Sequence, residues 1–198
     1  MRGAFDRPVQ RSVRLLVGLV LFGAALALLV QAHLGLDPWN VFNQGVSLHT
    51  GLSLGTITVI SSLALLLIWI PLKQRPGLGT VANALIVGPV LDLGLAIFPA
   101  PDALAWRISF LVASIVLLAV ASGLYLGAGW GAGPRDGLMR GLADLGMPVF
   151  AARAAVEITV LVVGWLLGGS VGVATVVFAL SIGPLVDRAL PRFRLAER

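Results

Sequence analysis

The chain has 198 residues, of which 58% are hydrophobic and only 12% charged, about half the ~25% of charged residues usual in soluble domains. Its mean hydropathy of +0.99 excludes a soluble globular domain and a disordered chain. Because it has no Cys and only two His, the composition also excludes disulfide scaffolds, thiol nucleophiles and thiolate or multi-His metal sites.

Six apolar stretches are long enough to cross ~30 Å of hydrocarbon as helices, which takes roughly 20 residues each. They cover residues 13–34, 54–72, 77–98, 106–127, 149–168 and 172–190. Apolar and polar residues do not alternate along them, as they would in β-barrel strands. The sequence therefore predicts an all-α, polytopic helix bundle that forms a single transmembrane domain over residues 1–198. The basic start also fits a removable signal peptide, although the repeat described below requires a helix there.

The positive charges predict the orientation of this bundle. Of the 14 Lys and Arg residues, only Arg107 falls on the side of the membrane opposite to the others. Since Lys and Arg concentrate in cytoplasmic loops, we expect a cytoplasmic (inner) membrane protein with both termini in the cytoplasm. The basic balance then reflects topology and contact with lipid headgroups, and nucleic acid is not an expected partner.

An internal repeat divides the chain into halves of residues 1–100 and 101–198. Residues 77–92 recur as residues 172–187 at a spacing of 95, and residues 35–45 recur as residues 131–141 at a spacing of 96. Each half contains three expected spans, an odd number, so the second half must enter the membrane upside down. Inverted-topology repeats of this kind are typical of secondary transporters.

Each half also contains a short segment led by proline. Pro38 and Pro134 suit the first turn of a helix, and Asp37 suits the N-cap position in front of the first of these helices. The segments are too short to span the membrane. They either lie on its surface, with Trp39 as an aromatic anchor, or dip into the membrane and expose N-terminal N–H groups that attract anions.

The remaining candidates are polar or helix-bending residues inside the expected spans. Proline should bend the helix at Gly88-Pro89 and at Gly183-Pro184, which makes these pairs either hinges of a moving bundle or plain packing bends. An acidic residue inside a membrane is a functional hypothesis by default. Glu157 is therefore a candidate proton or cation site, or half of a structural ion pair with Arg153 one turn away.

Asp92 and Asp187 occupy mirrored places beyond the two Gly-Pro pairs, as gating residues or as caps of freed backbone groups. Asn83, Asn40 and Arg135 complete the candidates for a substrate or ion pathway, although Arg135 also fits a cytoplasmic basic rim. The sequence contains no metalloprotease, serine-hydrolase or phosphate-loop motif. We therefore expect no enzymatic activity, no catalytic residues, no metal and no cofactor.

Three motifs together resemble the YczE/YitT-type bacterial membrane proteins. They are Gly-x-x-Pro-Trp-Asn from Gly35, Gly-Pro-Val-Leu-Asp from Gly88, and Gly-x-Gly-Pro-Arg-Asp-Gly-Leu from Gly131. The resemblance covers nearly the whole chain, and the third motif is its most specific part. It implies a small polytopic protein of the bacterial cytoplasmic membrane and carries over no catalytic or binding residues.

These observations predict a transporter of a small solute or ion that works by alternating access, and we expect a homodimer because the chain is short for a transporter. The first alternative is an accessory protein that supports a partner enzyme or a secretion system, with purely structural acids. The second alternative is an ion or water channel.

Overall fold

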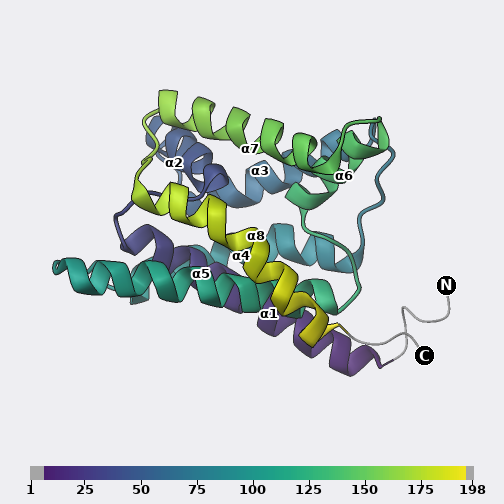
Figure 1. Ribbon diagram of the computed structural model, residues 1–198, viewed down its shortest axis with the longest axis horizontal. Helices are drawn as coiled ribbons and strands as arrows, with labels where there is room; N and C mark the ends of the chain where they lie inside the picture. Colours follow the sequence, from purple (N-terminus) through teal and green to yellow (C-terminus); the bar gives the residue numbers. More distant parts are fainter. Residues whose placement is uncertain (1–6, 195–198) are drawn as a thin grey trace.

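The computed structural model describes residues 7–194, which form eight helices and no strands (Figure 1). The helices are α1 (Pro8–Gln31), α2 (Pro38–Thr50), α3 (Leu54–Trp69), α4 (Leu78–Ile97), α5 (Leu104–Gly127), α6 (Pro134–Asp144), α7 (Val149–Leu166) and α8 (Val173–Phe193). The all-α, polytopic prediction is thus confirmed. Arg2 and Arg198, two of the charges used for orientation, lie outside the described residues.

Five of the described helices, α1, α4, α5, α7 and α8, are each long and apolar enough to cross a membrane. The stretch expected over residues 54–72 differs, because α3 has only 16 residues. It reaches the required length only together with α2, from which it is bent by 113°. Gly51 makes this bend possible, because its φ of 72° lies in the left-handed region that glycine adopts without strain. The described residues therefore contain five spans, or six if the bent pair counts as one.

Local hydrogen bonds explain where the two short helices begin. Pro38 and Pro134 occupy the first turns of α2 and α6, as the sequence predicts. Asp37 caps α2, since its Oδ2 accepts a hydrogen bond from the backbone N–H of Asn40 (3.4 Å). The carboxylate of Asp136 likewise accepts a hydrogen bond from the N–H of Gly133 (3.3 Å), the residue before α6.

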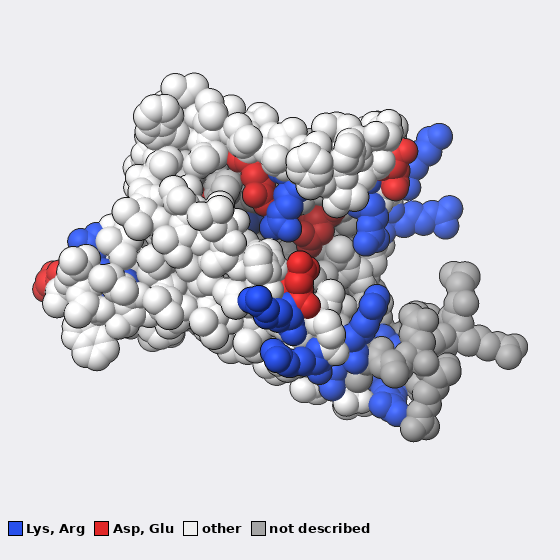
Figure 2. Space-filling model, in the orientation of Figure 1, with Lys and Arg blue, Asp and Glu red and all other residues white. Residues whose placement is uncertain are grey.

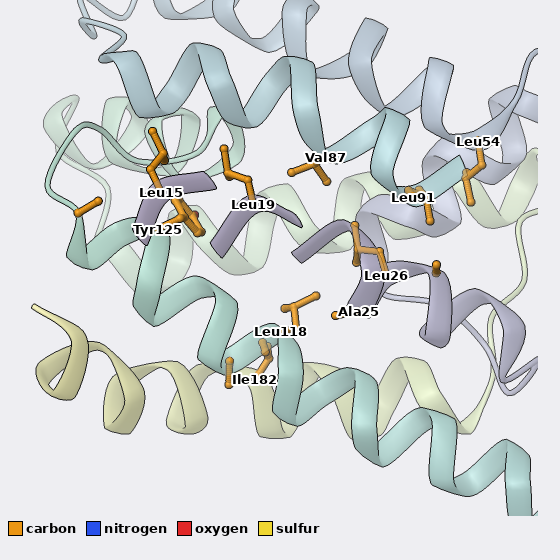
Figure 3. Packing of buried hydrophobic residues seen from close by; sticks show 13 residues of the cluster. Leu15, Leu19, Ala25, Leu26, Leu54, Val87, Leu91, Leu118, Tyr125 and Ile182 are labelled. Atoms are coloured by element: carbon orange, nitrogen blue, oxygen red, sulfur yellow. The ribbon is translucent and has the colours of Figure 1, made fainter. Parts of the chain in front are cut away.

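The hydrophobic core lies between α1, α4, α5 and α8 (Figure 3). Leu19 of α1 and Leu91 of α4 have no exposed surface, and Leu118 of α5 packs in the same cluster. Large apolar side chains also point outward, including Val116 on α5 and Leu180 on α8, at 52% and 74% exposed. So many exposed apolar side chains indicate contact with lipid rather than water.

Several contacts between the two halves of the chain occur in pairs, in which the halves exchange the roles of donor and acceptor. An arginine near the start of α1 donates a hydrogen bond to a carbonyl just after α5, and an arginine near the start of α5 donates one to a carbonyl just after α1. In the same way, an N–H group at the start of α4 donates to a carbonyl after α5, and one at the start of α8 donates to a carbonyl after α1. The pairs are Arg11 Nη1 to Ala128 O (2.7 Å) with Arg107 Nε to Ala32 O (2.8 Å), and Gly79 N to Trp130 O (2.7 Å) with Ala174 N to Leu34 O (2.9 Å).

The contact between α3 and α4 in the first half has no counterpart between α7 and α8 in the second half. Helix α3 packs closely on α4, where a Cβ added at Gly88 would collide with the carbonyl oxygen of Gly55 and lie 2.7 Å from Cγ2 of Val59. Helix α7 does not pack along α8, and a Cβ at Gly183 would meet nothing within 4 Å. Both α4 and α8 remain helical through Pro89 and Pro184, so the hinge interpretation of these residues stays a prediction.

The two ends of the bundle differ in charge. Helix α1 begins and α8 ends at one end (Figure 1), and Lys and Arg side chains gather there (Figure 2). We call it the basic end. The opposite end is the one where α4 ends and α5 begins.

Candidate functional site

A cavity of about 160 Å³ lies inside the bundle, and its mixed polar and apolar wall includes residues of α7 and α8. Figure 2 shows acidic and basic side chains gathered in the hollow between these two helices. All the charged residues that line it come from the loop before α2 and from α6, α7 and α8. They are Asp37, Arg135, Asp136, Arg153, Glu157 and Asp187.

The N-termini of α2 and α6 meet at this cavity. Nη1 of Arg135, in the first turn of α6, lies 3.5 Å from Oδ2 of Asp37 at the cap of α2. The same guanidinium lies 5.2 Å from the ring centre of Trp39. Each helix N-terminus, which carries partial positive charge, already has a carboxylate of the chain beside it, Asp37 or Asp136. The expectation that these N–H groups attract anions therefore receives no support.

Arg135 is held between a buried acid and an aromatic ring. The Asp37 side chain is only 3% exposed, whereas that of Arg135 is 22% exposed. Burial lowers the pKa of the Arg135 guanidinium from its ordinary value, while the carboxylates of Asp37 and Asp136 oppose this change. An arginine stays charged under these conditions. Its position inside the bundle shows that it is not part of a solvated basic rim.

The other carboxylates of the cavity differ in their partners. Oδ2 of Asp136 accepts a hydrogen bond from the Tyr125 hydroxyl (3.0 Å). Oε1 of Glu157 lies 2.9 Å from Nε of Arg153, which confirms the ion pair predicted from their spacing. Asp187 makes no hydrogen bond or ion pair with any described residue and lines the cavity.

The structure brings four of the predicted pathway residues to this cavity: Asn83, Arg135, Glu157 and Asp187. Asn40 lies beside it, fully buried, and its Nδ2 donates a hydrogen bond to Oδ1 of Asp37 (2.5 Å). Of the hinge candidates, only Gly183 lines the cavity.

Asp92 lies elsewhere, at the opposite end of the bundle. Its carboxylate accepts hydrogen bonds from the hydroxyl of Ser53 (2.5 Å) and the N–H of Gly55 (2.8 Å). Asp92 of α4 thus caps the first turn of α3 and holds the two helices together. Its mirrored residue in the sequence, Asp187, has no such partner, so the two acids are not equivalent in this structure.

The cavity residues that the predicted site did not include are mostly apolar or hydroxyl side chains, but they also include Asp37, Trp39, Tyr125 and Asp136, and the repeat bears on three of these four. Three of them belong to the repeated Pro-led segments, so the repeat itself was the signal that pointed to them. The interpretation of the first segment as a surface helix with Trp39 as an interfacial anchor is wrong. Helix α2 packs against α3 and α7, and Trp39 is only 6% exposed.

The described part of the chain contains no group of three or more His, Cys, Asp or Glu residues that could hold a metal ion. The acids of the cavity are thus separate groups on different elements rather than a converging ligand set. The arrangement suits a ligand that contacts carboxylates at several points of a mixed polar and apolar wall.

Comparisons with known proteins place the chain among bacterial relatives. Residues 9–190 match a family described as "Family of unknown function (DUF6198)". The chain is 40% identical over 174 residues to an uncharacterized protein of Haemophilus influenzae, which covers 87% of this chain and 80% of the relative. It is 31% identical over 179 residues to the uncharacterized membrane protein YczE of Bacillus subtilis, which covers 88% and 83%. This similarity confirms the resemblance seen in the motifs. No solved structure matches the chain.

Proposed function

The chain belongs to the DUF6198 family, and we propose from the geometry of its helices and cavity that this membrane protein transports a small solute or ion by alternating access. The cavity between α7 and α8 is the proposed substrate site. The proposal depends on one difference between the halves. Helix α3 packs on α4, whereas the corresponding helix α7 does not pack along α8.

The two halves of the chain fit a pair of inverted repeats. Two pairs of matching hydrogen bonds support this relation. The guanidinium groups of Arg11 and Arg107 form one pair with the carbonyls of Ala128 and Ala32, and the N–H groups of Gly79 and Ala174 form the other with the carbonyls of Trp130 and Leu34. Under such a relation the α3–α4 interface and the α7–α8 gap are counterparts on opposite sides of the membrane. A transporter that works by alternating access has the same asymmetry in each end state, because the pathway is closed on one side of the membrane and open on the other.

The distribution of Lys and Arg indicates which side of the membrane each end of the bundle faces in this state. Lys73 and Arg75 belong to the loop after α3, Arg140 to α6 and Arg192 to the last turn of α8, and Lys and Arg mark the cytoplasmic side. The proposal therefore places the basic end in the cytoplasm, with both termini there and the chain in the cytoplasmic membrane. The α7–α8 gap then opens the cavity to the cytoplasm, while the α3–α4 interface closes the outside.

In the proposed transition to the outward-open state, the α3–α4 contact is lost and an α7–α8 contact forms. In the outward-open state α3 leaves α4, which breaks the hydrogen bonds of Asp92 to Ser53 and Gly55. Helix α7 closes on α8, and the carboxylate of Asp187 takes the corresponding place at the N-terminus of α7. A carboxylate at a helix N-terminus is favourable in either state because it meets free N–H groups and the positive end of the helix dipole.

Distance measurements between pairs of nitroxide labels test this proposal. The chain has no native cysteine, so single pairs can be introduced at exposed positions without background. Thr56 with Leu93 reports on the α3–α4 interface, and Ala154 with Arg188 reports on the α7–α8 gap. The protein is reconstituted in lipid nanodiscs for the measurement.

We expect two populations for each pair, with short α3–α4 distances accompanying long α7–α8 distances and the reverse. One fixed distance for each pair under all conditions would overturn the proposal in favour of an accessory protein. Simultaneous opening at both pairs would favour a channel.

A further inference from the structure

We propose that the cavity binds a small organic cation, a protonated amine with a short chain. This inference rests on the proposed function, since it names the substrate class of the same cavity. The features that carry it are the charge balance of the cavity wall, the aromatic side chains in it, its size and one unsatisfied buried donor.

The wall of the cavity has an excess of negative charge. Four carboxylates and two guanidinium groups line it, which leaves two negative charges uncompensated. Arg153 is paired with Glu157, and Arg135 is paired with Asp37. Asp136 and Asp187 form no ion pair within the described residues. An entering anion would face net repulsion, whereas a cation would be attracted by two carboxylates that have no cationic partner within the described residues.

An organic cation fits this wall better than a metal ion. No three acids of the described chain converge closely enough to hold a metal. The wall instead contains the aromatic side chains of Phe22, Tyr125 and Phe178 beside apolar residues such as Leu118. Aromatic faces attract ammonium groups, and apolar side chains accommodate an alkyl chain. A protonated amine has both parts, because an alkylamine with a pKa of about 10.4 is charged at neutral pH.

The size of the cavity limits the ligand. Its volume is about 160 Å³, and a cavity of roughly 150 Å³ holds benzene. A molecule with about as many heavy atoms as benzene therefore fits while α7 and α8 stand apart.

A buried hydrogen-bond donor adds a second requirement. Trp39 lines the cavity and is 6% exposed, and its indole Nε1 has no acceptor among residues 7–194. A buried donor without a partner is costly, so an oxygen atom of the ligand would satisfy it. We therefore expect an amino alcohol to bind more tightly than a plain alkylamine of the same length.

Calorimetric titration of the purified full-length protein tests this with a series that varies only in charge. The probes are 4-aminobutan-1-ol, butane-1,4-diol and 4-hydroxybutyrate, which are cationic, neutral and anionic at neutral pH. We expect 4-aminobutan-1-ol to bind and the other two to bind at least about tenfold more weakly, as loss of a charge-assisted hydrogen bond implies.

A matched pair of variants locates the binding. Asp187→Asn should weaken binding of 4-aminobutan-1-ol about tenfold, and it removes no hydrogen bond that the described residues form. The control is Asp144→Asn, because Asp144 is an exposed acid of α6 that accepts a hydrogen bond from Gln74 outside the cavity. It should leave the affinity unchanged.

Tighter binding of the diol or of the hydroxy acid, absence of binding by all three probes, or equal affinities in the two variants would overturn the cation assignment. These results leave the proposed transport mechanism standing, since that is judged by the label distances. Binding of the amine with both label distances fixed would support the cation site and overturn transport.

Discussion

The two Gly-Pro pairs offer a direct perturbation of the proposed two-state equilibrium. Gly88→Ala adds a methyl group that collides with the carbonyl of Gly55 and lies 2.7 Å from Cγ2 of Val59. Gly183→Ala makes the same chemical change at the mirrored position, where nothing lies within 4 Å. The second variant is therefore a matched control in the state seen here.

The energetic difference follows from this contact. Overpacking a well-packed site costs about 1–3 kcal/mol, and here relief requires α3 to move away from α4. Replacing glycine with alanine inside a helix also gains roughly 0.8–1 kcal/mol, but this gain applies to both variants and to both states. We expect Gly88→Ala to shift the equilibrium by about 5- to 150-fold toward the state in which α3 and α4 are apart.

The nitroxide pairs described above measure this shift in nanodiscs. Gly88→Ala should convert the main α3–α4 distance from short to long and the main α7–α8 distance from long to short. Gly183→Ala should act in the opposite direction, because its methyl group meets α7 only when the α7–α8 gap closes. The population open at α7–α8 should then stay the same or increase.

Two results would refute this reasoning. If Gly88→Ala lowers the melting temperature and neither distance changes, the α3–α4 interface is a fixed structural contact. If both variants shift the distances in the same direction, the α3–α4 interface and the α7–α8 gap are not counterparts.

Three further variants test individual contacts. Asp92→Asn removes the charge that caps α3, so the long α3–α4 distance should gain population and the unfolding free energy should fall by about 0.5–2 kcal/mol; unchanged distances would contradict this. Trp39→Phe keeps a ring beneath Arg135 and removes the indole N–H. In titrations it should weaken 4-aminobutan-1-ol about fivefold and leave butylamine unaffected, and equal losses for both would contradict the proposed hydrogen bond. Combining Pro148→Ser with Phe150→Gly gives α7 the capping hydroxyl and the glycine that α3 has, so the short α7–α8 distance should gain population. A longer distance would contradict it.

The helices were predictable because hydropathy decides them. Except at the first helix, apolar stretches and observed helices agree within a few residues, since a membrane span needs length and apolarity more than any particular contact. Helix α3 differs from its prediction in another way, because it was expected to span the membrane alone. A hydropathy pattern cannot show the bend at Gly51, which follows from a single left-handed residue and the cap at Ser53.

The site was predictable only in part. The sequence marked Glu157, Asp187, Asn83 and Arg135 because charged or amide groups stand out in apolar surroundings. It did not single out Tyr125, whose hydroxyl meets Asp136 through the packing of α5 against the start of α6. Such a tertiary contact has no signature in spacing or composition.

Asp92 and Asp187 show most clearly what a repeat cannot predict. Their surroundings in the sequence are nearly the same, yet Asp92 has two hydrogen-bond donors and Asp187 has none within the described residues. The difference comes from the helices opposite them. Helix α3 begins Ser53-Leu54-Gly55, which supplies a hydroxyl and an N–H that a neighbouring helix can approach closely.

Helix α7 begins Pro148-Val149-Phe150 instead, with no capping hydroxyl, and proline provides no N–H. Phe150 is 77% exposed, so its side chain is not needed for packing in the open arrangement. The proposed α7–α8 closure should therefore differ in free energy from the observed α3–α4 closure, although the two halves contain similar sequence segments. Because the α3–α4 closure has the better donors, we expect the state with the cavity open between α7 and α8 to be the more stable of the two proposed states without ligand. In the proposed site, a bound cation would compensate the unpaired carboxylates of Asp136 and Asp187 and so lower the electrostatic cost of closing the cavity around them. Binding of the proposed substrate would then favour the opposite closure, which is the coupling that alternating access requires.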